Sequence, residues 1–287
     1  MLGPARGTWV ALSAVASSQP KAPAVDGDDT RTKTRALYSR LAEHCDLPPL
    51  PAVASQAMRL VREPDARAED VARVVATDAA IAARVLQISR SAMYARSRAP
   101  RTLGEAIVTL GFQTLQKILV AASARAAYRV DDAIAQRLWA HSLATALAAD
   151  ELAAAAREPR GGSAFLAGLL HDIGRLVFHI TDPSSYRTLG HSDDAAETAI
   201  FGGSHAVVGA CLAEHWGLDS DVVEAIMGHH GASPTGLALR IADADRIAGQ
   251  IGCGAVEVAA EPPATPEAAG LVARVAATFE AERGLFD

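Results

Sequence analysis

Apolar residues recur every three or four positions from residue 52 to about 127, without the alternation that marks a β-strand. This spacing predicts about five helices in the first half of the chain, because residues three and four apart share one face of an α-helix. The clearest run breaks near Asp78 and contains Val71, Val74, Val75, Ile81, Val85 and Ile88. The first half is therefore predicted to be a helical bundle.

Capping residues mark several helix boundaries in this half. Asp78 can accept hydrogen bonds from the first turn of the helix that follows it. Thr102 and Glu105 have the spacing of a capping box, which predicts a helix start at this point. Gly111 is expected to separate that helix from the next one.

The second half continues the helical pattern. A long helix is expected from about 133 to 157, before Pro159 and two glycines, and a second from about 163 to 179. Residues 181–195, which contain Pro183 and several acidic residues, are predicted to be a loop. Further helices are expected at 196–200, 204–216, 220–229, 235–250 and, after a Pro-rich linker, 267–283.

This pattern divides the chain into four parts. Residues 1–30 are rich in Pro, Gly, Ser and Ala without a sustained period, and we expect a disordered leader there. An N-terminal helical lobe is predicted at 31–127 and a C-terminal helical lobe at 128–252. Residues 253–287 are predicted to form a linker and a terminal helix. The fold class is therefore all-α, a multi-helix bundle in two lobes.

Composition supports this fold class and narrows the functions. Half of the 287 residues are apolar but only 5% are aromatic, which favours closely packed helices over a β-sandwich. The net charge of −6 and the lack of a basic recognition helix argue against nucleic-acid binding. The cysteines are odd in number and lack metal-type spacing, and are interpreted as reduced thiols of a cytoplasmic protein: Cys45, Cys211 and Cys253.

The apolar runs give no indication of a membrane protein. No uninterrupted run of apolar residues is long enough to predict a transmembrane helix. Residues 9–16 resemble a signal peptide loosely, but the stretch is short and interrupted by serine. We expect neither membrane insertion nor export.

A histidine and a carboxylate stand side by side at His171-Asp172, inside an otherwise apolar stretch. Burial of such a pair is costly unless it binds a metal or makes hydrogen bonds. Small residues at 164, 167, 168 and 174 share the face of His171 and leave room for other helices or for a ligand. His141 and His205 also lie on inward-looking faces. Each of these histidines alone is more often a hydrogen-bonded core residue than a ligand.

Convergence of several such residues changes that interpretation. Imidazole and carboxylate groups together suit a divalent transition metal. The candidate ligands come from five predicted helices of the second half: His141, His171, Asp172, His205, His229, His230 and Asp245. Asp243 lies on the opposite side of its helix from Asp245, so only one of the two can face the others. The remaining histidines are expected at the surface or in loops, without a role: His44, His179, His191 and His215.

These residues carry a family resemblance. His141, His171-Asp172 and Asp245 resemble the His…His-Asp…Asp pattern of the HD superfamily of metal-dependent phosphohydrolases. Nine further segments resemble blocks of one branch, the HDOD domain (HD-related output domain), over about residues 45–250: 47–51, 75–78, 83–86, 91–94, 105–111, 138–142, 164–174, 204–210 and 215–218. Two positions depart from that branch, since Ala79 replaces a proline and Arg90 an asparagine.

The resemblance implies a helical, generally non-catalytic module of bacterial signal transduction that acts through protein–protein contacts. The chain is also similar to the HD-GYP phosphodiesterases, which cleave cyclic di-GMP. Their tandem histidine is followed by Glu and a Gly-Tyr-Pro stretch, whereas His229-His230 is followed here by Gly231-Ala232. This difference argues against that reaction.

Two hypotheses remain, and we favour the first. In the first, the chain is a signalling adaptor that binds protein partners, with the histidine cluster as a relic or a metal-stabilised core. In the second, it is a metal-dependent phosphohydrolase. The second would use Mn, Fe, Mg or Zn, held by His141, His171, Asp172 and Asp245. His205, His229 and His230 would place a second metal or the substrate phosphate, and Asp172 would orient the attacking water. The partner, the input signal and the oligomeric state stay open.

Overall fold

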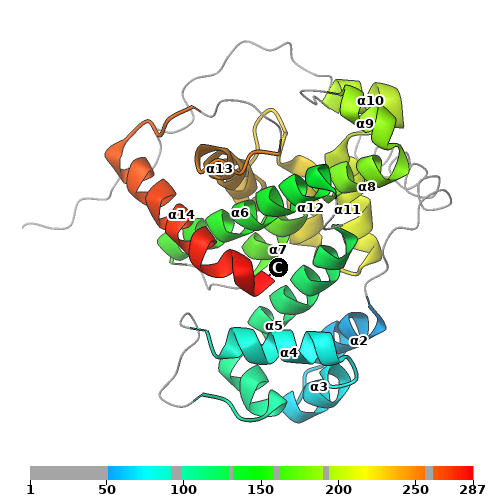
Figure 1. Cartoon of the computed structure of the whole chain (residues 1–287), viewed down its shortest axis with the longest axis vertical. Coiled ribbons are helices and arrows are strands. Elements are labelled where there is room, and N and C mark those ends of the chain that lie inside the picture. Colours follow the sequence, from blue (N-terminus) through cyan, green and yellow to red (C-terminus); the bar gives the residue numbers. More distant parts are fainter. Residues whose placement is uncertain are drawn as a thin grey trace, which may run out of the picture.

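The structure is a computed structural model of the chain, and it describes residues 51–91, 99–128, 132–157, 162–189, 194–255 and 261–286. All regular secondary structure within those ranges is α-helical, as predicted (Figure 1). The predicted leader at 1–30 lies outside the described residues, as do His44, Cys45 and His191.

The N-terminal lobe consists of α2 (Ala52–Val61), α3 (Ala68–Val75), α4 (Ala79–Ser89) and the first part of α5 (Leu103–Ala127), in the lower part of Figure 1. Both predicted caps form. Asp78 Oδ1 accepts from the backbone N–H groups of Ala80 and Ile81 at 3.0 and 3.1 Å. Thr102 Oγ1 accepts from the N–H of Glu105 at 3.1 Å, so sequence and local geometry agree at these helix starts.

Helix α5 connects the two lobes. Gly111, at φ 76° and ψ 162°, breaks its helical conformation where the sequence predicts a break. A side chain is strained at this positive φ, which explains the glycine. Beyond the break, Lys117 lies 2.5 Å from Asp150 of α6 (Ala133–Ala155) and 4.4 Å from the ring centre of Phe165. This buried ion pair fixes α5 against the second lobe.

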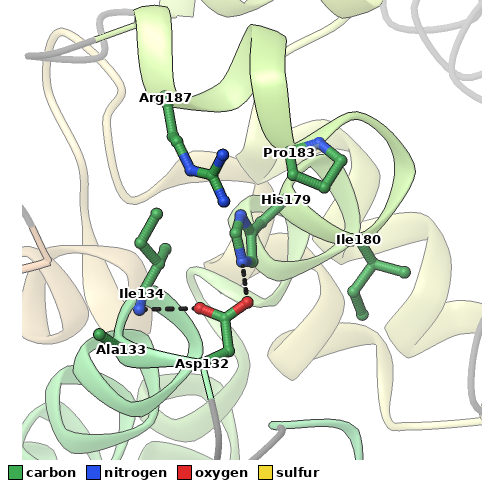
Figure 2. Close-up of a pocket in the computed structure, with 7 residues that line it drawn as sticks. All are labelled: Asp132, Ala133, Ile134, His179, Ile180, Pro183 and Arg187. Carbon is green, nitrogen blue, oxygen red and sulfur yellow. Dashed lines mark hydrogen bonds and ion pairs between the residues drawn. The ribbon is translucent and has the colours of Figure 1, made fainter.

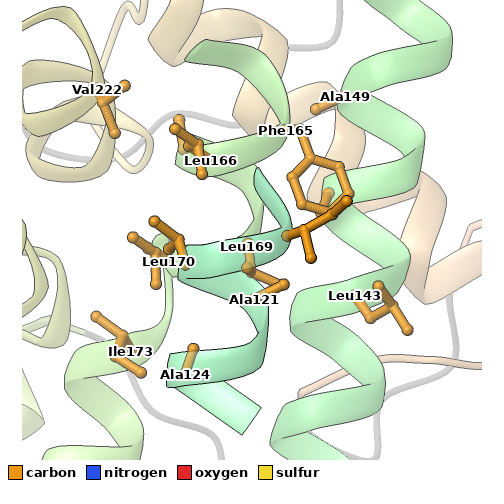
Figure 3. Close-up of a cluster of buried hydrophobic side chains, with 14 of the residues drawn as sticks. Ala121, Ala124, Leu143, Ala149, Phe165, Leu166, Leu169, Leu170, Ile173 and Val222 are labelled. Carbon is orange, nitrogen blue, oxygen red and sulfur yellow. The ribbon is translucent and has the colours of Figure 1, made fainter. Parts of the chain in front are cut away.

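The C-terminal lobe is built around α6 and α7 (Ser163–Leu170). Phe165 and Leu169 of α7 lie between α6 and the end of α5, against apolar residues such as Leu143 and Ala121 (Figure 3). Around this centre pack α8 (Ile173–Thr181), α11 (His205–His215), α12 (Ser220–Gly228) and α13 (Gly236–Gln250). The same apolar core continues into the N-terminal lobe.

Two sequence predictions in this lobe are wrong. The single helix expected at 163–179 is two helices, α7 and α8, with His171-Asp172 in the break between them. The loop expected at 181–195 contains α9 (Pro183–Thr188), because Asp182 Oδ1 accepts from the N–H groups of Ser184 and Ser185 and starts a new helix. A further helix, α10 (Asp194–Phe201), follows.

The terminal helix α14 (Pro266–Phe286) packs along α6 and also touches α4, α5 and α13. Val275 and Phe279 are buried in that contact. The terminal helix therefore docks on its own domain.

By length and composition alone, Leu103–Ala127 and Ser163–Thr181 could cross a membrane. The uninterrupted-run criterion used on the sequence missed both segments, the second of which comprises α7 and α8. In the fold, 61% and 89% of their most apolar windows are buried. Packing in the core accounts for most of their apolar character.

Candidate metal centre

The break between α7 and α8 presents His171 and Asp172 to the centre of the lobe. His141 reaches the same point from the middle of α6, and His205 is the first residue of α11. Asp245 comes from α13, and the end of α12 supplies the tandem histidines His229-His230. The seven candidate ligands of the sequence therefore converge, and we call this set the histidine–aspartate cluster.

Two glycines let the helices approach closely enough for this convergence. A Cβ on Gly168 would lie 2.9 Å from the backbone of Ala146 and of Thr145, so α7 contacts the backbone of α6 directly. A Cβ on Gly174 would overlap the carbonyl oxygen of His205, so α8 packs directly against the start of α11. The small residues around His171 therefore make room for neighbouring helices.

His141 and His171 face each other through their Nε2 atoms, which are 3.1 Å apart. The Nδ1 of His141 lies 2.8 Å from the carbonyl oxygen of Cys253, and that of His171 lies 2.8 Å from the carbonyl oxygen of Gly168. A carbonyl only accepts, so each Nδ1 carries the ring proton. In the neutral rings, two Nε2 lone pairs then point at one another.

The second group repeats this arrangement. His229 Nδ1 donates to the carbonyl oxygen of Ile226 at 2.6 Å, and His205 Nδ1 donates to the carboxylate of Glu197 at 2.6 Å. Their Nε2 atoms lie 3.8 and 3.0 Å from Asp172 Oδ1. His230 Nε2 is 3.1 Å from His205 Nε2. Again, lone pairs and a carboxylate oxygen share one space.

Two atoms at this point lack a hydrogen bond within the part of the chain that the structure describes. Asp172 Oδ1 and His229 Nε2 are both buried and have no partner of suitable geometry. Buried polar atoms are rarely left in that state. Because both are acceptors aimed into the same space, a cation would satisfy them.

Two groups that the sequence analysis missed support the cluster. Arg175 Nε lies 2.8 Å from Asp172 Oδ2, and its NH1 nitrogen lies 3.1 Å from Glu197 Oε1. Glu197 is completely buried and also accepts from the backbone N–H of His205 at 2.7 Å. Arg175 follows Asp172 by one helical turn, so helical spacing could have identified it. Glu197 reaches His205 across a turn between two helices, which periodicity does not show.

The pKa values of the four buried histidines of the cluster are shifted in opposite directions. Burial lowers the pKa of His141, but Asp172 and Asp245 outweigh it and raise that pKa above its ordinary value. Burial is likewise outweighed by Asp172 at His205, whose pKa rises to about 9. Burial and neighbouring histidines instead lower the pKa of His171 to about 3, and that of His229 falls well below its ordinary value. In each group the carboxylates thus favour the protonated form of one histidine, and burial favours the neutral form of the other.

The donor set fits a divalent metal. Asp172, His205, His229 and His230 can each offer a ligand atom within 4.8 Å of the others, and His141, His171 and Asp172 form a second such group. Imidazoles whose other nitrogen is held by a carbonyl or carboxylate are the usual form of metal-ligating histidine. Transition metals such as Mn, Fe or Zn suit these donors better than Mg.

Asp245, and not Asp243, faces this cluster. Asp245 Oδ1 lies 3.4 Å from His141 Nε2, whereas Asp243 pairs with Arg246 at 2.9 Å. His215 is exposed, as expected. The prediction for His179 is wrong: this residue is buried on α8 and bonds to Asp132 at 2.6 Å. The ligand roles themselves stay predictions.

The profile of the HDOD domain matches residues 47–232, which is more than half of the chain. Among curated proteins, one from Treponema pallidum, of no stated function, is 26% identical over 211 residues, which cover 70% of this chain and 41% of that protein. The chain thus spans less than half the length of this relative.

Solved structures show the same fold. A proposed phosphohydrolase from Shewanella amazonensis superposes with a TM-score of 0.66 at 24% identity, over 88% of this chain and 95% of that one. A proposed signal transduction protein from Marinobacter aquaeolei gives a TM-score of 0.61 at 24% identity, over 90% of this chain and 64% of that one.

Proposed function

Because this chain belongs to the HDOD domain family, we propose that it is a regulatory protein of bacterial signalling whose histidine–aspartate cluster holds a divalent metal as a buried structural centre. Its helical surface then serves to bind a signalling protein partner. The proposed signal transduction protein of similar fold supports this role.

Burial of the cluster is the observation that carries the proposal. His141, His171, Asp172, His205 and His229 are each at most 3% exposed. A catalytic metal centre keeps a coordination position open to water and substrate, whereas a structural centre is closed by protein ligands. The many inward donors and the closed surroundings together favour a structural centre.

Arg175 adds a second argument. Its guanidinium occupies Asp172 Oδ2 at 2.8 Å and leaves Oδ1 as the oxygen that faces His205 and His229. Fixed pairing of one carboxylate oxygen limits the freedom of Asp172 to bridge two metals or to orient a water. Arg175 and Glu197 instead hold Asp172 and His205 in place, as supporting groups do around metal ligands.

Metal content and hydrolysis, measured on the same protein, test the proposal. We expect protein purified without chelator to contain divalent metal, and the His229→Ala variant to lose it. The exposed His215→Ala variant is the matched control and should retain it. Hydrolysis of nucleotides and phosphodiesters with added Mn²⁺ or Mg²⁺ should not differ between wild type and His229→Ala. Metal-dependent turnover that disappears in His229→Ala would overturn the regulatory role.

A metal-dependent phosphohydrolase is the second candidate, and one observation favours it. His230 is exposed and the Asp245 side chain is 33% exposed, so one edge of the cluster reaches the surface. A divalent metal bound there would lower the pKa of a coordinated water. The chain would contribute Asp172 to orient that water and His230 to contact a phosphate at the open edge. The name of the Shewanella protein is consistent with this candidate.

A further inference from the structure

A second polar site lies at the other end of α8. The start of α6, the end of α8 and α9 surround a pocket of about 540 Å³ (Figure 2). Its lining consists of Asp132, Ala133, Ile134, His179, Ile180, Pro183 and Arg187. None of these residues belongs to the histidine–aspartate cluster.

Asp132 fixes the position of the proton on His179. Its Oδ1 already accepts from the N–H groups of Ile134 and Ala135 at 2.9 and 3.1 Å, which caps α6. Its Oδ2 lies 2.6 Å from His179 Nε2. Because a carboxylate accepts, Nε2 carries the proton, and the neutral ring presents the lone pair of Nδ1.

That lone pair is buried and lacks a hydrogen-bond partner among the residues that the structure describes. His179 as a whole is only 3% exposed, and it lines the pocket. Buried acceptors are normally satisfied by protein, water or a ligand. This nitrogen is covered by protein atoms, with the Arg187 guanidinium on its side of the ring, so a ligand that donates to it must displace that cover.

Arg187 needs hydrogen-bond acceptors, whereas His179 Nδ1 needs a donor. Figure 2 shows its guanidinium directed toward the ring of His179, on the side away from Asp132. A guanidinium only donates, and it binds the oxygens of an anion in pairs. The charges of Asp132 and Arg187 cancel, so charge alone does not select the ligand, and the pocket favours one that both accepts and donates.

We propose that this pocket binds an oxyanion that retains a hydroxyl proton, namely a hydrogenphosphate group. Its charged oxygens would accept from Arg187, and its O–H would donate to His179 Nδ1. The pocket is larger than a phosphate ion, and Ile134, Ile180 and Pro183 add apolar surface. The ligand is thus either free phosphate or the phosphate of a small organic monoester.

Calorimetric titration of the full chain with inorganic phosphate and with sulfate tests the hydroxyl requirement. Sulfate has the same shape but no proton near neutral pH, so it would leave Nδ1 unsatisfied. We expect phosphate to bind at least about tenfold more tightly, because a site that needs a hydroxyl rejects the analogue without it. Equal affinity for the two ions would overturn the proposal.

Phenyl phosphate distinguishes free phosphate from a phosphate monoester as the ligand. The titration is done at pH 6, where about half of a monoester keeps its proton. Tighter binding than that of free phosphate indicates a monoester.

Three variants locate the site. Arg187→Gln should weaken phosphate binding at least about tenfold, since a charge-assisted pair is lost. Arg274→Gln, which removes an exposed arginine on α14, is the control and should bind as the wild type does. Asp132→Asn keeps an oxygen for the cap but donates to His179 Nε2, which moves the ring proton to Nδ1. This variant should therefore lose the preference for phosphate over sulfate. Phosphate binding that survives Arg187→Gln but is lost in His229→Ala would place the ion in the cluster and overturn the proposal.

Discussion

The histidine–aspartate cluster and the His179 pocket use the same side chain in opposite ways. In the cluster, His141, His171, His205 and His229 are held through Nδ1 and present Nε2 to a shared interior space. In the pocket, His179 is held through Nε2 and presents Nδ1 alone, beside an exposed arginine. The number of converging acceptors separates a site for a multivalent cation from a site for a single hydroxyl donor.

Removal of the Asp172 carboxylate should have the largest effect on the cluster. Asp172→Ala leaves Arg175 and the protonated histidines without their buried counter-charge, a change that costs about 3–5 kcal/mol. Urea unfolding of wild type and variant measures it. The control is Asp243→Ala, which breaks a largely exposed pair with Arg246 and should cost less than about 1 kcal/mol. Equal destabilisation by both variants would show that the buried Asp172 charge stabilises the fold no more than an exposed ion pair does.

The pH dependence of stability should reverse with metal. His205 has a pKa raised to about 9 in the folded chain. Its stabilisation is complete below the ordinary pKa of 6.5 and is lost as pH rises through about 9. Since each pKa unit corresponds to about 1.4 kcal/mol, the metal-free protein should lose a few kcal/mol over this range.

With metal, the opposite trend is expected, because protons no longer compete for the imidazoles. Thermal unfolding at pH 6, 7.5 and 9, with chelator and with excess Zn²⁺ or Mn²⁺, measures both slopes. The same slope in both series would contradict a shared site for proton and metal.

Close packing of α8 on α11 holds the two halves of the cluster together. Gly174→Ala places a methyl group against the His205 carbonyl and should cost about 1–3 kcal/mol through overpacking. Gly104→Ala should be neutral or slightly stabilising, because the added Cβ would lie 4.0 Å from its nearest neighbour, Thr102 Oγ1. Chemical denaturation compares the two. Equal stability of both variants would mean that α8 can move away without loss.

The bond between Asp132 and His179 should make the smallest contribution to stability. Asp132→Ala removes the cap of α6, which costs about 0.5–2 kcal/mol, together with the bond to His179. Asp78 caps α4 with the same geometry and has no histidine partner among the described residues, so Asp78→Ala measures the cap alone. The difference between the two variants, about 1 kcal/mol, is the expected contribution of the His179 bond. No difference would mean that Asp132 acts on the helix alone.

Local features of this fold were predictable, and contacts between distant residues were not. The caps at Asp78 and Thr102 and the break at Gly111 depend on neighbouring residues, so the sequence identified them. His141, His171 and His205 were found because each was placed on an inward helix face. The other cluster residues were found from their residue type and the family pattern: Asp172, His229, His230 and Asp245. Glu197 was missed because it meets His205 across a turn between two helices, which periodicity does not show. The Asp132–His179 pair was missed because two helices far apart in the sequence must pack before these partners meet. The helix α9 was missed because Asp182, its cap, was read as part of an acidic loop.

The carbonyl oxygen of Cys253, which holds His141, lies beyond the stretch that the family profile matches. A shorter protein cut after residue 232 would lose this contact together with Asp245 and all of α13. It would keep every recognisable block of the family but leave a buried imidazole free to rotate. The smallest piece of the chain that sequence comparison recognises is therefore smaller than the piece that can hold the cluster together, and a domain transplanted into another protein should extend at least through residue 255.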